Sequence, residues 1–181
     1  PRPNSEYSFH VAVQSDDKII VCGSERRRIN GIDEWGVFVW RFTANGVLDT
    51  TFGTDGAVSN VSSQWIGLGE IYLQINELLV LPNDKIVVNQ TFSKAGENFV
   101  MLSKYNANGS KDLSYGSNGE SLKSAVPIDG YNNSCSVLQR YGSIISSITV
   151  GNQEEGVVTE VLYISDAAGN LDLSLNLNQG K

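Results

Sequence analysis

Short apolar runs separated by clusters of Asn, Asp, Gly and Ser make up most of this chain. Phe9, Val11 and Val13 alternate with polar or small residues, and the apolar run 19–22 follows a turn at 15–17. Alternation with a period of two is typical of a half-buried strand, whereas a helix needs apolar residues about every three or four positions. Few windows show helical spacing, so the pattern predicts an all-β fold that opens with a hairpin.

The next apolar stretch is richer in aromatic and β-branched residues. It covers residues 35–42 and predicts a long strand. A tight turn at residues 43–46 ends that strand, because Asn45 and Gly46 tolerate the positive φ angles that such turns require.

This strand and turn belong to an internal repeat. Residues 38–56 return as residues 101–119, at an offset of 63, and a weaker copy covers residues 161–175. The hairpins that precede the three copies lie at residues 13–21, 80–88 and 138–145. The period predicts three antiparallel β-sheet repeats of about 60 residues in one repeat domain, approximately 1–66, 67–127 and 128–181.

The first unit carries the fullest form of the repeated motif. Its segments are Asp17-Lys18-Ile19 with Gly23, Arg41-Phe42 with Asn45-Gly46, and Leu48-Asp49 with Thr51-Phe52-Gly53 and Gly56. This long motif resembles the delta-60 repeat, a bacterial β-propeller-type repeat. The second unit departs from it at Asn89-Gln90, and the third has Ile164-Ser165 and Leu175-Asn176 in place of the basic-aromatic and Phe-Gly pairs.

The resemblance implies propeller-like blades. A four-stranded blade cannot cover both of its faces alone, so it stacks on neighbours, and closed propellers contain about four to eight blades. Three units therefore predict an incomplete propeller, an open array, or a ring completed by association as a homo-oligomer. The start at residues 1–4 has no signal-peptide pattern and favours a piece of a longer propeller.

Charge and hydropathy exclude two classes of partner. The chain has 13 basic and 20 acidic residues, a net charge of −7, which argues against binding to nucleic acid. No apolar run reaches the roughly 18 residues of a membrane-spanning helix. We therefore expect a protein or glycan surface, unidentified, as the partner.

Residues suited to catalysis are few. His10 is the only histidine, which excludes most Ser-His-Asp and Cys-His arrangements. Adjacent carboxylates occur at Asp16-Asp17, Asp33-Glu34 and Glu154-Glu155, all in predicted turns. Neighbouring turn residues usually point apart into water, whereas glycoside cleavage needs two carboxyls about 5–10 Å apart in a cleft. We expect no catalytic residue and no cofactor.

Three aspartates recur after the repeated turn, namely Asp49, Asp112 and Asp172. A carboxylate at this place can accept backbone N–H groups and fix the turn, which explains its recurrence better than three copies of a catalytic group. No metal-ligand series with the spacing of a calcium loop is present, although oxygen-rich turns leave calcium binding open. Cys22 and Cys135 are interpreted as small buried hydrophobes rather than a disulfide.

Candidate ligand-binding residues are Arg26, Arg27 and Arg28, placed in a predicted loop between two strands, with Trp35 and Trp65 beside turns. Arginine forks suit an anionic glycan or an acidic surface, and tryptophan stacks on sugar rings. A solvated loop and core aromatics are the alternatives to this interpretation.

Together these features predict a non-catalytic module for binding or structural scaffolding. The resemblance implies a secreted or surface-exposed bacterial protein. Two alternatives stay open: a phage tail or fibre component that touches a host surface, and a carbohydrate-active enzyme domain that uses loop carboxylates.

Overall fold

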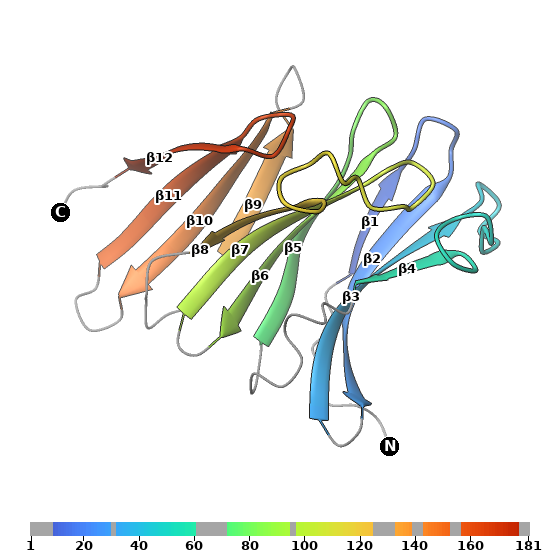
Figure 1. Cartoon of the computed structure of the whole chain (residues 1–181), viewed down its shortest axis with the longest axis horizontal. Helices are drawn as coiled ribbons and strands as arrows, with labels where there is room; N and C mark the ends of the chain where they lie inside the picture. The colour runs from blue at the N-terminus through green and yellow to red at the C-terminus, as the bar shows by residue number, and fades with distance from the viewer. Residues whose placement is uncertain are drawn as a thin grey trace.

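The computed structural model describes residues 9–29, 32–60, 72–94, 97–124, 133–138, 143–152 and 157–177. Within these ranges the chain forms twelve strands and no helix, arranged as three antiparallel sheets of four strands (Figure 1). No helix in these ranges could therefore cross a membrane. The all-β fold and its three repeated sheets are as the sequence predicted.

Each sheet is a meander in which neighbours in sequence are neighbours in space. We call the sheets blades 1, 2 and 3. Blade 1 contains β1 (Phe9–Val13), β2 (Ile19–Ile29), β3 (Ile32–Phe42) and β4 (Ala57–Asn60). Blade 2 contains β5 (Tyr72–Val80), β6 (Ile86–Lys94), β7 (Glu97–Tyr105) and β8 (Glu120–Ser124). Blade 3 contains β9 (Asn133–Leu138), β10 (Ile144–Asn152), β11 (Val157–Ser165) and β12 (Leu171–Leu177).

The blades lie face to face as an incomplete propeller, and their first strands β1, β5 and β9 contact one another (Figure 1). Alternating side chains of each strand meet the next blade, as the period of two requires. The core between blades 1 and 2 consists of Ile20, Cys22, Val37, Val39 and Phe52 against Ile75, Leu78, Ile86, Val88 and Tyr105. A second cluster, Leu81, Val87, Leu102, Tyr115 and Ile144, joins blades 2 and 3.

The predicted tight turns are formed by residues with positive φ. Gly46, Gly109 and Gly169 occupy the same place after the third strand of each blade, with φ of 78°, 88° and 83°. Asp17 and Asp84 take φ of 62° and 59° in the turns of the first hairpins. These positions explain why Gly, Asn and Asp recur in the repeat.

Blades 1 and 2 have a long loop between their third and fourth strands, whereas the corresponding connection in blade 3 is short. We call residues 49–56 and 112–119 the aromatic-glycine loops, after Phe52-Gly53 and Tyr115-Gly116. In blade 3 the fourth strand β12 starts at Leu171, soon after β11 ends at Ser165. Asp172 then pairs with Ile164 across the sheet. Asp172 therefore lies on a strand, and the role of its carboxylate in fixing a turn stays a prediction.

Candidate functional site

The arginine triplet lies on a strand and not in the predicted loop. Arg26, Arg27 and Arg28 belong to β2, which continues to Ile29 and pairs with β3 along its whole length. The prediction of a loop was wrong because charged residues are depleted in strands only on average, and a strand can still contain a run of them. Their role as ligand-binding residues stays a prediction.

The register of the ribbon places opposite charges across from one another. Arg27 pairs with Glu34 and Arg28 with Asp33. Opposite charges in facing positions stabilise a sheet. Asp33-Glu34 is accordingly part of β3 and not a turn, which corrects the second sequence prediction for this hairpin.

The two predicted tryptophans have different outcomes. Trp35 lies on β3, opposite Arg26, and not beside a turn. Trp65 lies outside the described residues. The role of these tryptophans as ligand-binding residues stays a prediction.

His10 and Cys22 are both used by the fold. His10 Nε2 lies 3.1 Å from the carbonyl oxygen of Ile75, so this side chain joins β1 to blade 2. Cys22 is fully buried, and burial raises the pKa of its thiol to about 12. A thiol in that state is a poor nucleophile. Cys135 lies on β9.

The paired carboxylates show no acid-base arrangement within the described residues. Asp16-Asp17 forms the predicted turn, where Asp16 pairs with Lys18 at 2.9 Å. Glu154-Glu155 lies outside the described residues. No group of three metal-ligating side chains is found in the described ranges.

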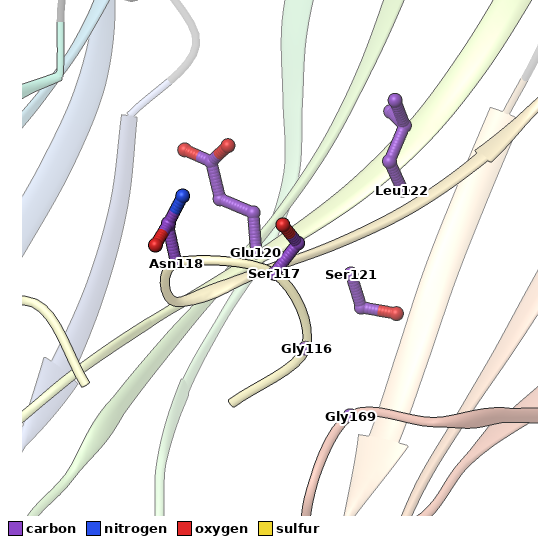
Figure 2. A pocket seen from close by; sticks show the side chains of 7 residues that line it. All are labelled: Gly116, Ser117, Asn118, Glu120, Ser121, Leu122 and Gly169. Carbon is purple, nitrogen blue, oxygen red and sulfur yellow. The ribbon is translucent and has the colours of Figure 1, made fainter. Parts of the chain in front are cut away.

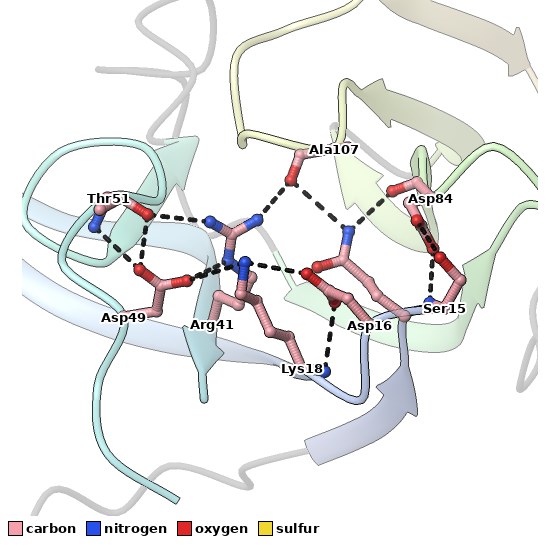
Figure 3. Close-up of polar contacts among 9 residues, drawn as sticks. Ser15, Asp16, Lys18, Arg41, Asp49, Thr51, Asp84 and Ala107 are labelled. Carbon is pink, nitrogen blue, oxygen red and sulfur yellow. Dashed lines mark hydrogen bonds and ion pairs between the residues drawn. The ribbon is translucent and has the colours of Figure 1, made fainter. Parts of the chain in front are cut away.

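The strongest polar cluster lies where blade 1 meets blade 2 (Figure 3). Arg41 Nε donates to Asp49 Oδ2 at 2.9 Å, and both side chains are buried. The other carboxylate oxygen, Oδ1, accepts the backbone N–H of Thr51 at 3.1 Å and its hydroxyl at 2.6 Å. Asp49 therefore fixes the start of the aromatic-glycine loop and also orients a cation, whereas the sequence predicted that it fixes the preceding turn.

Arg41 uses its remaining groups to reach the next blade. Its Nη1 donates to the carbonyl oxygen of Ala107 at 2.7 Å, and its guanidinium lies 4.8 Å from the centre of the Phe52 ring. The backbone N–H of Gly53 donates to the carbonyl of Asn108 at 2.9 Å. The loop and the cation of blade 1 are thus bound to the turn of blade 2.

The first hairpins of the two blades are joined as well. The Ser15 backbone N–H and hydroxyl donate to the carboxylate of Asp84 at 2.7 and 2.5 Å (Figure 3). Gln14 Nε2 donates to the Asp84 carbonyl at 2.9 Å.

The junction of blades 2 and 3 repeats this arrangement. Its donor residues lie 63 residues after the corresponding donors of the first junction. Lys104 Nζ donates to the carbonyl of Ala167 at 3.1 Å and lies 4.9 Å from the centre of the Tyr115 ring. The Gly116 N–H donates to the carbonyl of Ala168 at 2.7 Å. Residues at corresponding positions therefore make similar contacts at both junctions: a basic side chain and a loop glycine N–H each donate to a carbonyl of the next turn.

Asp112 takes the place of Asp49 at this second junction. It accepts Lys85 Nζ at 2.8 Å and the Ser114 hydroxyl at 2.6 Å, with Lys104 Nζ at 3.8 Å. Burial alone would raise the pKa of Asp112, but the hydrogen bonds from Lys85 and Ser114 outweigh it and lower the pKa to about 2. Burial lowers the pKa of Lys104, and the Asp112 carboxylate opposes that shift.

Sequence reasoning missed the bridging role of these cations. Arg41 and Lys104 are separated by the same number of residues as the turn glycines, and this spacing could have indicated that they have the same role. The sequence of one unit, however, does not indicate that the hydrogen-bond partner is a backbone carbonyl of the next unit.

A pocket of about 360 Å³ lies beside the second aromatic-glycine loop (Figure 2). Its lining is Gly116, Ser117, Asn118, Glu120, Ser121, Leu122 and Gly169. The carboxylate of Glu120 is paired with Lys111. The described lining offers hydroxyl, amide and backbone groups for hydrogen bonding, together with the carboxylate of Glu120.

Comparison with known proteins agrees with the architecture. Residues 14–52 match a family model described as "Domain of unknown function (DUF5122) beta-propeller". No curated protein and no solved structure gives a significant match. The matched segment runs from the first hairpin turn to Phe52. It includes Arg41, which bonds to Ala107 of blade 2, and Gln14 and Ser15, which bond to Asp84. The matched segment and the three stacked sheets identify the units of this chain as β-propeller-type repeats.

Proposed function

We propose that this chain is a non-catalytic scaffold and binding module built of delta-60-type repeats, in a secreted or surface-exposed bacterial protein. One observation carries the proposal: the repeated charged residues join blade to blade. Arg41 and Lys104 each donate to a carbonyl of the following turn, at 2.7 and 3.1 Å. Side chains bound in this way serve assembly and are not disposed toward a substrate.

The secreted or surface-exposed location is supported only by the resemblance of the repeat motif, and fold analogy is an associational argument. The net charge of −7 is compatible with it, because acidic charge favours solubility. The proposed partner is a protein or glycan surface, which is consistent with the polar pocket beside the second aromatic-glycine loop.

The scaffold role is tested by removing one bridging cation. Lys104→Met keeps most of the aliphatic volume but loses the bond to the Ala167 carbonyl. Because a hydrogen bond from a charged donor contributes about 1.5–3 kcal/mol, we expect the free energy of unfolding in urea to fall by about 2 kcal/mol. Lys104→Arg, which places the residue type of blade 1 at this site, is the matched control and should lose less than about 1 kcal/mol.

The free energies of unfolding of the two variants together test whether the hydrogen bond to the next blade stabilises the chain. A Lys104→Met variant as stable as the parent would contradict the scaffold role of the repeated cation. A stability loss that Lys104→Arg shares in full would show that packing of the lysine, and not its donor group, matters.

A further inference from the structure

The pocket beside the second aromatic-glycine loop is lined by the hydroxyl group of a buried residue. Ser121 of β8 belongs to the lining and is only 6% exposed. Its side chain lies on the side of β8 that faces the turn residue Gly169 of blade 3, whereas Glu120 and Leu122 point to the other side (Figure 2). Successive side chains of a strand alternate in this way. The pocket therefore lies between blades 2 and 3, and the Ser121 hydroxyl faces into it.

Among the described residues, the Ser121 hydroxyl has no hydrogen-bond partner, although more than nine-tenths of this residue is buried. Buried polar groups in folded proteins nearly always bond to protein or to ordered water. Because a serine hydroxyl can both donate and accept, it can meet this requirement with a ligand that enters the pocket. Ser121 therefore marks the pocket as a place for a polar guest.

The equivalent position in blade 1 is filled by a larger, apolar side chain. Val58 lies 63 residues before Ser121, at the offset of the repeat, and packs against the core between blades 1 and 2. A Cβ atom built on the loop glycine Gly53 would lie 2.9 Å from Val58 Cγ2. At Gly116 the corresponding neighbour is the backbone N of Ser121, at 3.2 Å. Serine in place of valine thus removes the side chain that fills this space in blade 1.

The groups around the pocket define the chemistry of its ligand. The described lining contains no basic side chain that could bind an anion and no aromatic ring that could stack on a planar base. The Glu120 carboxylate in the lining is paired with Lys111. Hydroxyl, amide and backbone groups suit a neutral ligand that both donates and accepts hydrogen bonds. The volume of about 360 Å³ lies at the lower end of the range for small-molecule sites, so the ligand is small.

We propose that this pocket binds one uncharged pyranose unit of a glycan, with the Ser121 hydroxyl as one of its hydrogen-bonding groups. The hydroxyls of a sugar ring donate and accept, as the lining requires. The pocket is partly open to solvent, so a glycan chain can continue outwards from the bound unit. The inference rests on the proposed binding role of the chain and names the class of its ligand.

The probes are the methyl α-pyranosides of glucose, mannose and galactose, each titrated into the full isotope-labelled chain. Amide NMR spectra then report binding residue by residue. We expect at least one of these sugars to cause saturable shifts at Gly116, Ser121 and Gly169. The dissociation constant should be roughly 1 mM, as expected for a ligand of this size.

Two variants of Ser121 test the site itself. Ser121→Val restores the side chain of blade 1, fills the pocket and should weaken binding by about tenfold or more. Ser121→Ala keeps the space but removes the hydroxyl, so binding should weaken by roughly threefold to tenfold, the equivalent of one hydrogen bond. Ser59→Val makes the same change at an exposed position of β4 and is the matched control, with unchanged affinity.

The absence of saturable shifts with all three pyranosides, up to about tenfold above the expected dissociation constant, would overturn the proposal. Inorganic phosphate is the comparison anion, and an affinity for phosphate equal to that for the sugars would overturn the neutral class of ligand. Binding that Ser121→Val leaves unchanged would overturn the location. If Lys104→Met is destabilising while no pyranoside binds, only the pocket assignment fails and the scaffold function stands.

Discussion

Replacing a turn glycine with alanine can destabilise the chain in two ways, through backbone strain and through overlap of the new Cβ atom with its neighbours. Gly46 and Gly109 allow these two effects to be measured separately. Gly46 and Gly109 have φ of 78° and 88°, so alanine is strained at both. Only at Gly109 would the new Cβ also lie 2.9 Å from Gly53 N and 3.0 Å from the Phe52 ring. We expect Gly46→Ala to lower the free energy of unfolding by about 1–2 kcal/mol and Gly109→Ala by about 1–3 kcal/mol more, from strain plus overpacking.

Urea denaturation of the two glycine variants measures this difference directly, with the parent chain as reference. Equal losses would mean that the close approach of the two blades at Gly109 adds nothing to stability.

Asp112 gives the chain a stability that depends on pH. Burial would raise the pKa of Asp112, but the hydrogen bonds from Lys85 and Ser114 lower it from 3.8 to about 2. Between pH 2 and pH 4 the unfolded chain therefore binds more protons than the folded chain. The stabilisation by Asp112 is complete above pH 4 and is lost as the pH falls through 2. Allowing for solvent screening, we expect Asp112 to contribute about 1–2 kcal/mol.

The measurement is the free energy of unfolding against pH, between pH 2 and 6, for the parent and Asp112→Asn. The difference between the two curves should shrink as the pH falls, because the parent loses the charged hydrogen bonds. Parallel curves would contradict the lowered pKa of Asp112.

At the scale of elements, the β2–β3 ribbon allows a test of the arginine triplet. The backbone register places Arg27 opposite Glu34. Arg27→Glu or Glu34→Arg alone puts like charges in facing positions, and the double exchange restores the pair. We expect a favourable coupling energy of about 0.2–1 kcal/mol from the double-mutant cycle, measured by urea denaturation at low salt. A coupling of zero would favour the interpretation of these arginines as ligand-binding residues.

Much of the element structure was predictable, because the repeat places the same turn residues at the same points. The hairpin that starts at Phe9 and the turn at Gly46 followed from period-two alternation and from positive φ. The ends of strands were harder. Charges at residues 26–28 indicated a loop, yet these residues pair with β3 in the backbone register and belong to a strand.

Blade 3 shows that a shared residue can lie in a different element. Asp172 keeps the spacing of Asp49 and Asp112 but lies on β12 opposite Ile164. The cation that the first two aspartates approach is absent at that position, because isoleucine replaces it. In this blade a different carboxylate, Asp166, accepts the N–H groups of Ala168 and Asn170 at 2.9 Å and holds the turn.

At the scale of the whole molecule, the stacking of units was predictable from their repeated apolar faces, while the polar contacts between them were not. Arg41 reaches Ala107, 66 residues away. Such a contact depends on how two blades meet, and a pattern within one unit carries no information about that geometry. The contacts of Asp49 with Thr51 lie within one unit, so a local role for this aspartate could be predicted from the unit alone.

The two ends of the array differ, and this difference predicts the state of association. In blade 1 nothing lies within 4 Å of a Cβ built on the turn residue Gly46, and the β1 side chains of Phe9, Val11 and Val13 are exposed. Blade 3 has isoleucine in place of the cation and, among its described residues, no aromatic-glycine loop. Blade 3 of one chain therefore lacks the groups that would bind it to blade 1 of a second chain. We expect a monomer of about 20 kDa, close to the sequence mass of 19.7 kDa, by light scattering over a range of concentrations. A dimer that dissociates when Gly46 is changed to alanine would contradict this, since it would show that blade 3 docks on blade 1 without either donor. A dimer unaffected by that change would place self-association on another surface and leave the polarity of the array intact.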